Sequence, residues 1–97
     1  MESLKIVVLN RALNAIQNTY DWYRINLSIS AANHFREGIY NTIETLSKMP
    51  SIGRKDDSYK GKQQYYSFLS HPKYRIVYRY TDTTLYIVAI RATMMSL

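Results

Sequence analysis

The chain has 97 residues, 46% of them hydrophobic, which suits a single domain, residues 1–97, with one core. The absence of cysteine excludes disulfides and thiolate metal sites, and the absence of a long apolar run or a signal-peptide layout predicts a cytoplasmic protein away from membranes. The net charge of +6 is uneven, with five basic and four acidic residues before position 54 but eight and three from there on. The C-terminal half therefore favours a polyanionic or acidic partner.

The first part of the chain predicts a strand and then a helix. Residues 4–9 form a short, β-branched apolar run that is typical of a strand inside a sheet or under a helix. A first helix, capped by Asn10, should follow and end near Asn26. Its apolar side chains recur at helical spacing and form one stripe: Leu13, Ile16, Tyr20, Tyr23 and Leu27.

A second helix is expected between a cap at Ser28 or Ser30 and a stop signal at Pro50. Gly38 lies in its interior, where glycine costs about 1 kcal/mol relative to alanine. Because only a few residues join the two helices, they should form an antiparallel hairpin. The apolar stripe of the second helix is Ala32, Phe35, Ile39, Ile43 and Leu46.

The rest of the chain predicts a loop and three strands. Residues 50–62 contain two glycines, one proline and six charges, which indicates a loop. Apolar side chains then alternate over 63–69, 74–80 and 84–91, and the short turns between these strands imply an antiparallel meander. The helix hairpin must cover one sheet face to bury its stripes. We therefore predict an α+β fold of order β-α-α-β-β-β, with the hairpin packed on a small antiparallel sheet.

Basic side chains of the second half are the candidates for binding. Strand alternation places Arg75 and Arg79 on one face, roughly 13 Å apart at ~3.3 Å per residue, where both could bind successive phosphates or an acidic partner. The alternative is a pair of ordinary exposed arginines that flank Val77. The other candidates for contacts with nucleic acid or an acidic protein are Arg54, Lys55, Lys62, Lys73 and Arg91.

Histidines and tyrosines offer further chemistry. His71 lies in the predicted turn 70–73, where an imidazole that titrates near neutrality could act as an acid or base, or simply serve as a polar turn residue. His34, on the second helix, is interpreted as structural or solvent-facing. Two isolated histidines form no metal site, and no cofactor motif is present, so we expect neither metal nor cofactor. Six of the ten tyrosines belong to the predicted meander and suit base stacking, a protein interface or plain core filling: Tyr65, Tyr66, Tyr74, Tyr78, Tyr80 and Tyr86.

Three segments resemble the RelE/ParE family of type II toxin–antitoxin toxins. Residues 46–54 (LSKMPSIGR) resemble the helix-ending L-x-x-x-P-x-x-G-R of that family, residues 74–79 (YRIVYR) its Y-R-I-x-Y strand, and residues 85–91 (LYIVAIR) its last strand. The segments occur in the order of the family, and the resemblance covers nearly the whole chain. It implies a toxin that forms a hetero-oligomer with an acidic, partly disordered antitoxin, which would lie across the helix hairpin and the basic sheet region.

The resemblance leaves the target of the toxin open. RelE-like relatives cleave mRNA on the ribosome without a metal, and Arg75 matches the arginine that some of them use near the scissile phosphate. This is our first expectation, with Arg75 and His71 as catalytic residues. ParE-like relatives inhibit DNA gyrase, and a degenerate toxin would only bind antitoxin. The charge-free strand 63–69 and the residues Ala92 and Met94, which stand where the family often has His and Arg, favour these alternatives.

Overall fold

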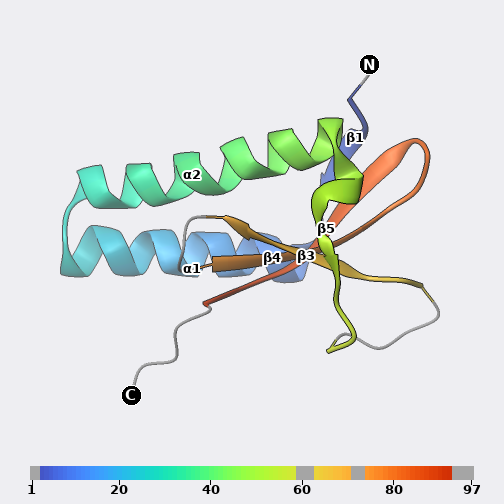
Figure 1. Ribbon diagram of the computed structural model, residues 1–97. Helices are drawn as coiled ribbons and strands as arrows, with labels where there is room; N and C mark the ends of the chain where they lie inside the picture. The colour runs from blue at the N-terminus through green and yellow to red at the C-terminus, as the bar shows by residue number, and fades with distance from the viewer. Residues whose placement is uncertain (1–2, 59–62, 71–73, 93–97) are drawn as a thin grey trace.

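Two helices form one layer and a sheet forms the other in the computed structural model, which describes residues 3–58, 63–70 and 74–92 (Figure 1). The predicted α+β class and the order of its elements are confirmed. In chain order the elements are β1 (Lys5–Val8), α1 (Asn10–Asn26), α2 (Ile29–Lys48), the 3-10 helix η1 (Pro50–Ile52), β2 (Arg54–Lys55), β3 (Tyr66–Ser70), β4 (Tyr74–Tyr80) and β5 (Thr84–Ala92).

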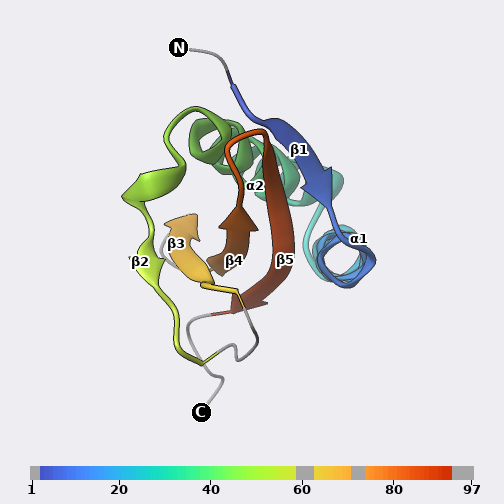
Figure 2. The same cartoon turned by 90° about the vertical axis from the view of Figure 1, so that its right-hand side faces the viewer.

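The sheet is mixed, not purely antiparallel as predicted. Its strand order is β1-β5-β4-β3-β2, and the meander from β2 to β5 is antiparallel throughout. The strand β1 instead pairs in parallel with β5, which brings Lys5 opposite Thr84 and Val8 opposite Ile87. A parallel pair needs a long connection, and the helix hairpin with the meander supplies one. β1 is therefore an edge strand beside β5 (Figure 2), so the first of its two predicted settings, inside the sheet, is wrong, whereas the second, under a helix, agrees with its contacts to α2 and the core.

The segment after α2 contains a short strand where the sequence predicted only a loop. Residues Arg54 and Lys55 pair with β3, opposite Ser67 and Tyr66. The buried Tyr78 holds this segment on the sheet, because its hydroxyl donates to the Pro50 carbonyl (2.6 Å) and accepts from the Gly53 N–H (3.0 Å). A Cβ on residue 53 would collide with the Tyr78 ring and hydroxyl, so glycine is needed there. We call this arrangement the Tyr78 clamp.

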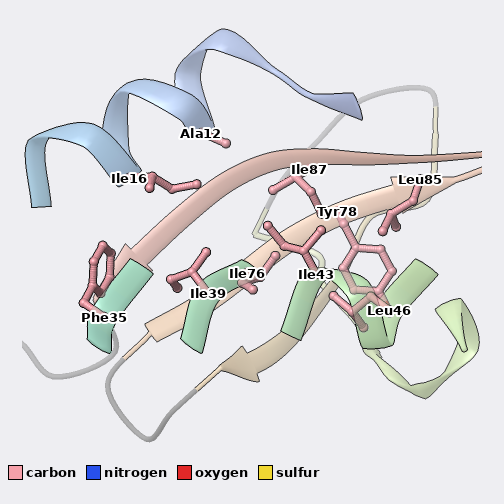
Figure 3. Packing of buried hydrophobic residues seen from close by; sticks show 10 residues of the cluster. All are labelled: Ala12, Ile16, Phe35, Ile39, Ile43, Leu46, Ile76, Tyr78, Leu85 and Ile87. Atoms are coloured by element: carbon pink, nitrogen blue, oxygen red, sulfur yellow. The ribbon is translucent and has the colours of Figure 1, made fainter. Parts of the chain in front are cut away.

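The core lies between α2 and the central strands (Figure 3). All five members of the predicted α2 stripe are buried, which confirms that stripe, and Ser28 caps the helix by accepting from the Ala31 N–H (3.0 Å). Each buried Leu or Ile side chain stabilises the fold by roughly 1.5–3 kcal/mol. The sheet side chains that pack against the helices include Ile76, Tyr78, Leu85 and Ile87.

The predicted stripe of α1 is only partly correct. Ile16 is buried together with Ala12, whereas Leu13 and Leu27 are exposed. The turn end of the hairpin extends beyond the start of β4 (Figure 1), so the sheet does not lie under Leu27. The predicted cap is also wrong, because Asn10 is the first helical residue and the capping position, Leu9, has no side-chain hydrogen bond to the helix.

Candidate functional site

The sheet face opposite the helices gathers arginines from three strands. Residues that pair across neighbouring strands project from the same face of a sheet. Arg75 on β4 pairs with Arg91 on β5, and Arg79 pairs with Tyr86. We call the surface formed by Arg54, Arg75, Arg79 and Arg91 the arginine face; Arg75 and Arg79 lie on it together, as strand alternation predicts.

A β-bulge in β5 places Arg91 on this face. Val77 pairs with Ala89 while the next residue, Tyr78, pairs with Ile87, so Val88 is an extra residue in the ladder. Side chains of a strand alternate between its two faces, and one extra residue reverses the alternation beyond it. Without the bulge, Arg91 would share the helix-facing side with Ile87. The bulge also buries Val88 and Ala89 against Val77 beneath the arginines.

The Tyr78 clamp places Arg54 next to Arg75. Arg54 lies opposite Ser67 at the β2 edge of the sheet and is exposed. A hollow of about 290 Å³ is lined by Ile52, Arg54, Ser67, Phe68, Leu69 and Arg75. Two guanidinium groups at one hollow suit a phosphate or carboxylate, because the planar fork of arginine can donate two parallel hydrogen bonds to either group.

An aromatic ring holds Arg79 on the arginine face. It is half-buried, and its guanidinium lies 4.0 Å from the centre of the Tyr86 ring. Such stacking restrains the guanidinium through the negative face of the aromatic ring. Arg79 therefore presents a fixed positive charge, whereas Arg75 and Arg91 are more exposed.

A buried carboxylate beneath the arginine face was missed from the sequence. Asp56 is 7% exposed, and its Oδ1 accepts hydrogen bonds from the Ser58 N–H (3.0 Å) and the Ser58 hydroxyl. Burial acts to raise the pKa of Asp56, but the bonds from Ser58, the nearby Ser67 hydroxyl and the charge of Arg75 outweigh it and lower the pKa below 3.8. The other oxygen, Oδ2, has no hydrogen bond of standard geometry among the described residues. Ser58 is therefore the main partner of the Asp56 carboxylate, and the charge of Arg75 is the smallest of these contributions. The D-x-S spacing, typical of an Asx turn, was the only sequence signal of this site.

Lys55, another predicted site residue, does not join the arginine face. Lys55 pairs with Tyr66, and since successive strand residues point to opposite faces, its side chain points away from the side of Arg54. His71, Lys62 and Lys73 lie outside the described residues. Four meander tyrosines turn toward the helices, so core filling is confirmed for them: Tyr66, Tyr74, Tyr78 and Tyr80.

The described residues contain no group of three His, Cys, Asp or Glu side chains that could hold a metal ion. None of the helices described is long and apolar enough to cross a membrane.

Comparison with known proteins places this fold in a family. The family model for the ParE toxin of the type II toxin–antitoxin system parDE matches residues 6–97. No curated protein matches the chain in sequence. Among solved structures, the chromosomal ParDE toxin–antitoxin system from P. aeruginosa has a TM-score of 0.77 at 12% identity, covering 95% of this chain and 98% of that one.

Two further solved structures share the fold at lower similarity. The YoeB dimer from Staphylococcus aureus has a TM-score of 0.58 at 18% identity and covers 93% of this chain and 97% of that one. The YoeB/ParE toxin from Agrobacterium tumefaciens has a TM-score of 0.57 at 19% identity, with coverage of 94% and 100%. Since the family model spans the described elements from β1 to β5, the chain belongs to the ParE toxin family of type II toxin–antitoxin systems.

Proposed function

We propose that the protein inhibits DNA gyrase, as the resemblance to ParE-like toxins implies, and that the arginine face contacts the gyrase–DNA complex. Membership of the ParE family supports the target. The observation that supports the contact surface is the convergence of Arg75, Arg91 and Arg54 on the sheet face opposite the helices. This proposal reverses the first expectation from the sequence, which was mRNA cleavage.

The arginine face suits a polyanion for electrostatic reasons. Guanidinium groups on neighbouring strands can together neutralise a row of phosphates or acidic side chains. The apolar cluster of Val77, Val88 and Ala89 lies among these arginines and is buried, with Leu9 and Tyr65 packed against it. Binding of this kind weakens as salt is added, because counterions compete for the same charges.

A gyrase supercoiling assay with purified protein tests this proposal. The wild-type chain, shown to be active by growth arrest on expression, should inhibit supercoiling, and Arg75→Gln should weaken inhibition at least tenfold. Lys48→Gln removes the same charge from an exposed site at the end of α2 and should leave inhibition within about twofold of wild type. Full supercoiling in the presence of a toxic wild-type protein would rule out gyrase as the target.

Ribosome-dependent mRNA cleavage is the second candidate, and Asp56 favours it. RNA cleavage through the 2′-hydroxyl requires a proton acceptor beside a group that binds the phosphate; Asp56 lies near Arg75, but its buried carboxylate would have to become accessible when a message binds. The lowered pKa of Asp56 makes it a weak base, so we place this function second. Primer extension on a message translated in a cell-free system should show new cuts at occupied codons, and Arg75→Ala should remove them. An intact message leaves gyrase as the proposed target.

A further inference from the structure

A small apolar pocket opens between the helix hairpin and the end of the sheet, away from the arginine face. Its volume is about 130 Å³. Apolar protein cavities on the order of 150 Å³ are known to admit a benzene ring, so this pocket is large enough for one branched or aromatic side chain. His34, exposed as expected, is at the pocket and already has an interaction partner. Besides His34 and Ala31, the pocket is lined by Tyr23, Phe35, Gly38, Ile39, Ser70 and Tyr74.

Polar atoms around the pocket already have partners. The hydroxyls of Tyr23 and Tyr74 lie 2.8 Å apart, within hydrogen-bond distance. The Ser70 hydroxyl lies 2.8 Å from that of Thr42, and both are within reach of the Gly38 carbonyl, at 3.3 and 3.0 Å. Since a buried polar guest needs unsatisfied partners, these internal bonds favour an apolar guest.

Gly38 keeps the pocket open. A Cβ added at this position would meet nothing within 4 Å, so the missing side chain leaves empty space beside Phe35 and Ile39. A glycine in a helix interior costs roughly 1 kcal/mol relative to alanine. A guest side chain from a partner would fill the space that an alanine or larger residue would otherwise occupy.

Exposed apolar side chains continue from the pocket around the tip of the hairpin. Trp22 packs edge-on against Tyr23 with ring centres 5.5 Å apart, which joins the tip to the pocket wall. The tip extends beyond the sheet (Figure 1), and its large apolar residues are 54–70% exposed. Contiguous apolar surface of this kind marks a protein-binding site. These residues are Trp22, Ile25, Leu27 and Ile29.

Charge distinguishes between the possible occupants of this surface. Asp21 and Arg24 at the tip form an ion pair at 3.8 Å, so the surface itself offers a nucleic acid little attraction. Two copies of a chain with a net charge of +6 repel one another, whereas an acidic partner is attracted to the whole molecule. The toxin family supplies such a candidate, because a type II toxin has an antitoxin partner.

We propose that the pocket bounded by Tyr23, Phe35, Gly38 and Tyr74 receives one branched or aromatic side chain from an amphipathic segment of an acidic antitoxin. The remaining apolar residues of that segment cover Trp22, Ile25 and Leu27. This surface lies in the helix layer, and the site that we propose for the target lies on the other side of the sheet. The antitoxin contact is therefore independent of the gyrase proposal.

A substitution of Gly38 that puts a side chain of this protein into the pocket tests this inference. Gly38→Leu places a side chain in the pocket and removes a helix-interior glycine, so the variant should melt at or above the wild-type temperature and still inhibit the target. Its affinity for the antitoxin encoded by the neighbouring gene, measured by isothermal titration calorimetry, should fall at least tenfold. Gly38→Ala fills less of the pocket and should give a smaller loss. Asn41→Leu adds the same side chain at an exposed position of α2 and should bind within about twofold of wild type.

Two results would overturn the inference. Wild-type affinity in a folded Gly38→Leu variant would show that no antitoxin side chain enters the pocket. Sedimentation of the same proteins measures their oligomeric state. A wild-type dimer that dissociates in Gly38→Leu would assign the pocket to a second copy of the chain instead.

Discussion

At the scale of single residues, Asp56 carries a negative charge beneath a surface of positive ones. Its carboxylate is almost fully buried, yet the hydrogen bonds from Ser58 and the charge of Arg75 keep its pKa below the ordinary value. A buried charge is tolerated only when neighbours compensate its lost hydration. The charge of Asp56 therefore depends on these neighbours, chiefly on the two hydrogen bonds from Ser58.

Acid should expose this dependence. A carboxyl whose folded pKa lies below its unfolded pKa contributes stability that is present above the unfolded value and is lost as the pH falls through the folded value. For Asp56 that loss occurs below 3.8. Asp56→Asn should be less stable than wild type at neutral pH and should lose less stability on acidification, as urea midpoints at several pH values would show. Parallel pH profiles for the two proteins would contradict this assignment.

The sequence patterns predicted which arginines share a face better than they predicted the surroundings of those arginines. Alternation placed Arg75 and Arg79 on one face because β4 is regular over seven residues. The orientation of Arg91 depends on the extra residue Val88, and no local pattern in the sequence marks a bulge there. The burial of Asp56 arises from contacts with β3 and β4, which are distant in the chain, so composition suggested only a polar loop.

At the scale of secondary-structure elements, the two described glycines have opposite roles. Gly38 faces open space in α2, whereas Gly53 allows the chain to approach the Tyr78 hydroxyl. Gly38→Ala should therefore stabilise the fold by about 0.5–1 kcal/mol, because alanine favours a helix interior. Gly53→Ala should destabilise it by about 1–3 kcal/mol, because the new Cβ displaces Tyr78. Chemical denaturation measures both changes in the free energy of unfolding. A change of the same sign in the two variants would contradict the geometry.

The Tyr78 clamp predicts a separate effect on the strand that carries Arg54. Burial raises the pKa of Tyr78 to about 12, so its hydroxyl keeps its proton and remains both donor and acceptor at neutral pH. Tyr78→Phe removes both bonds and should cost about 1–3 kcal/mol, as urea unfolding would report. Tyr40→Phe, on the exposed side of α2, should change stability by less than about 0.5 kcal/mol. If both variants unfolded alike, the clamp would have no energetic role.

Helix α2 was predictable because its whole stripe faces one sheet. Helix α1 was harder, since Leu13 is apolar at the expected spacing yet exposed, and the small Ala12 takes the buried position. The two-residue strand β2 was missed for another reason. Its residues, Arg54 and Lys55, have no strand-like side chains, and pairing with β3 together with the Tyr78 clamp holds them in the sheet.

At the scale of the whole molecule, the helix layer and the open sheet face offer different chemistry. The hairpin tip is apolar with paired charges, and the opposite surface is rich in arginine. A toxin that must be silenced can use the first surface for its antitoxin and the second for its target. The family resemblance implied both partners and placed the antitoxin across the hairpin and the basic sheet region; the separation of the two surfaces is our proposal, and it rests on where the apolar and basic side chains lie in the fold.

Antitoxin binding should raise the thermal stability of this small domain. A ligand that binds only the folded state stabilises it by about 2.7 kcal/mol at a free concentration of 100 times Kd. For a domain of this length, that corresponds to a Tm increase on the order of 10–20 °C. Circular dichroism melts with and without the antitoxin encoded by the neighbouring gene would measure the shift. An unchanged Tm at micromolar antitoxin would contradict the partnership, and an unrelated acidic protein serves as the control.

The parallel pairing of β1 with β5 has a consequence for the synthesis of the protein. Lys5 lies opposite Thr84, so the first strand cannot take its place until β5 has left the ribosome. Arg91 belongs to that same late strand, and the arginine face is therefore assembled last. We expect the nascent toxin to be inactive until β5 joins the sheet, the same step at which an antitoxin already in the cell could first capture the folded domain.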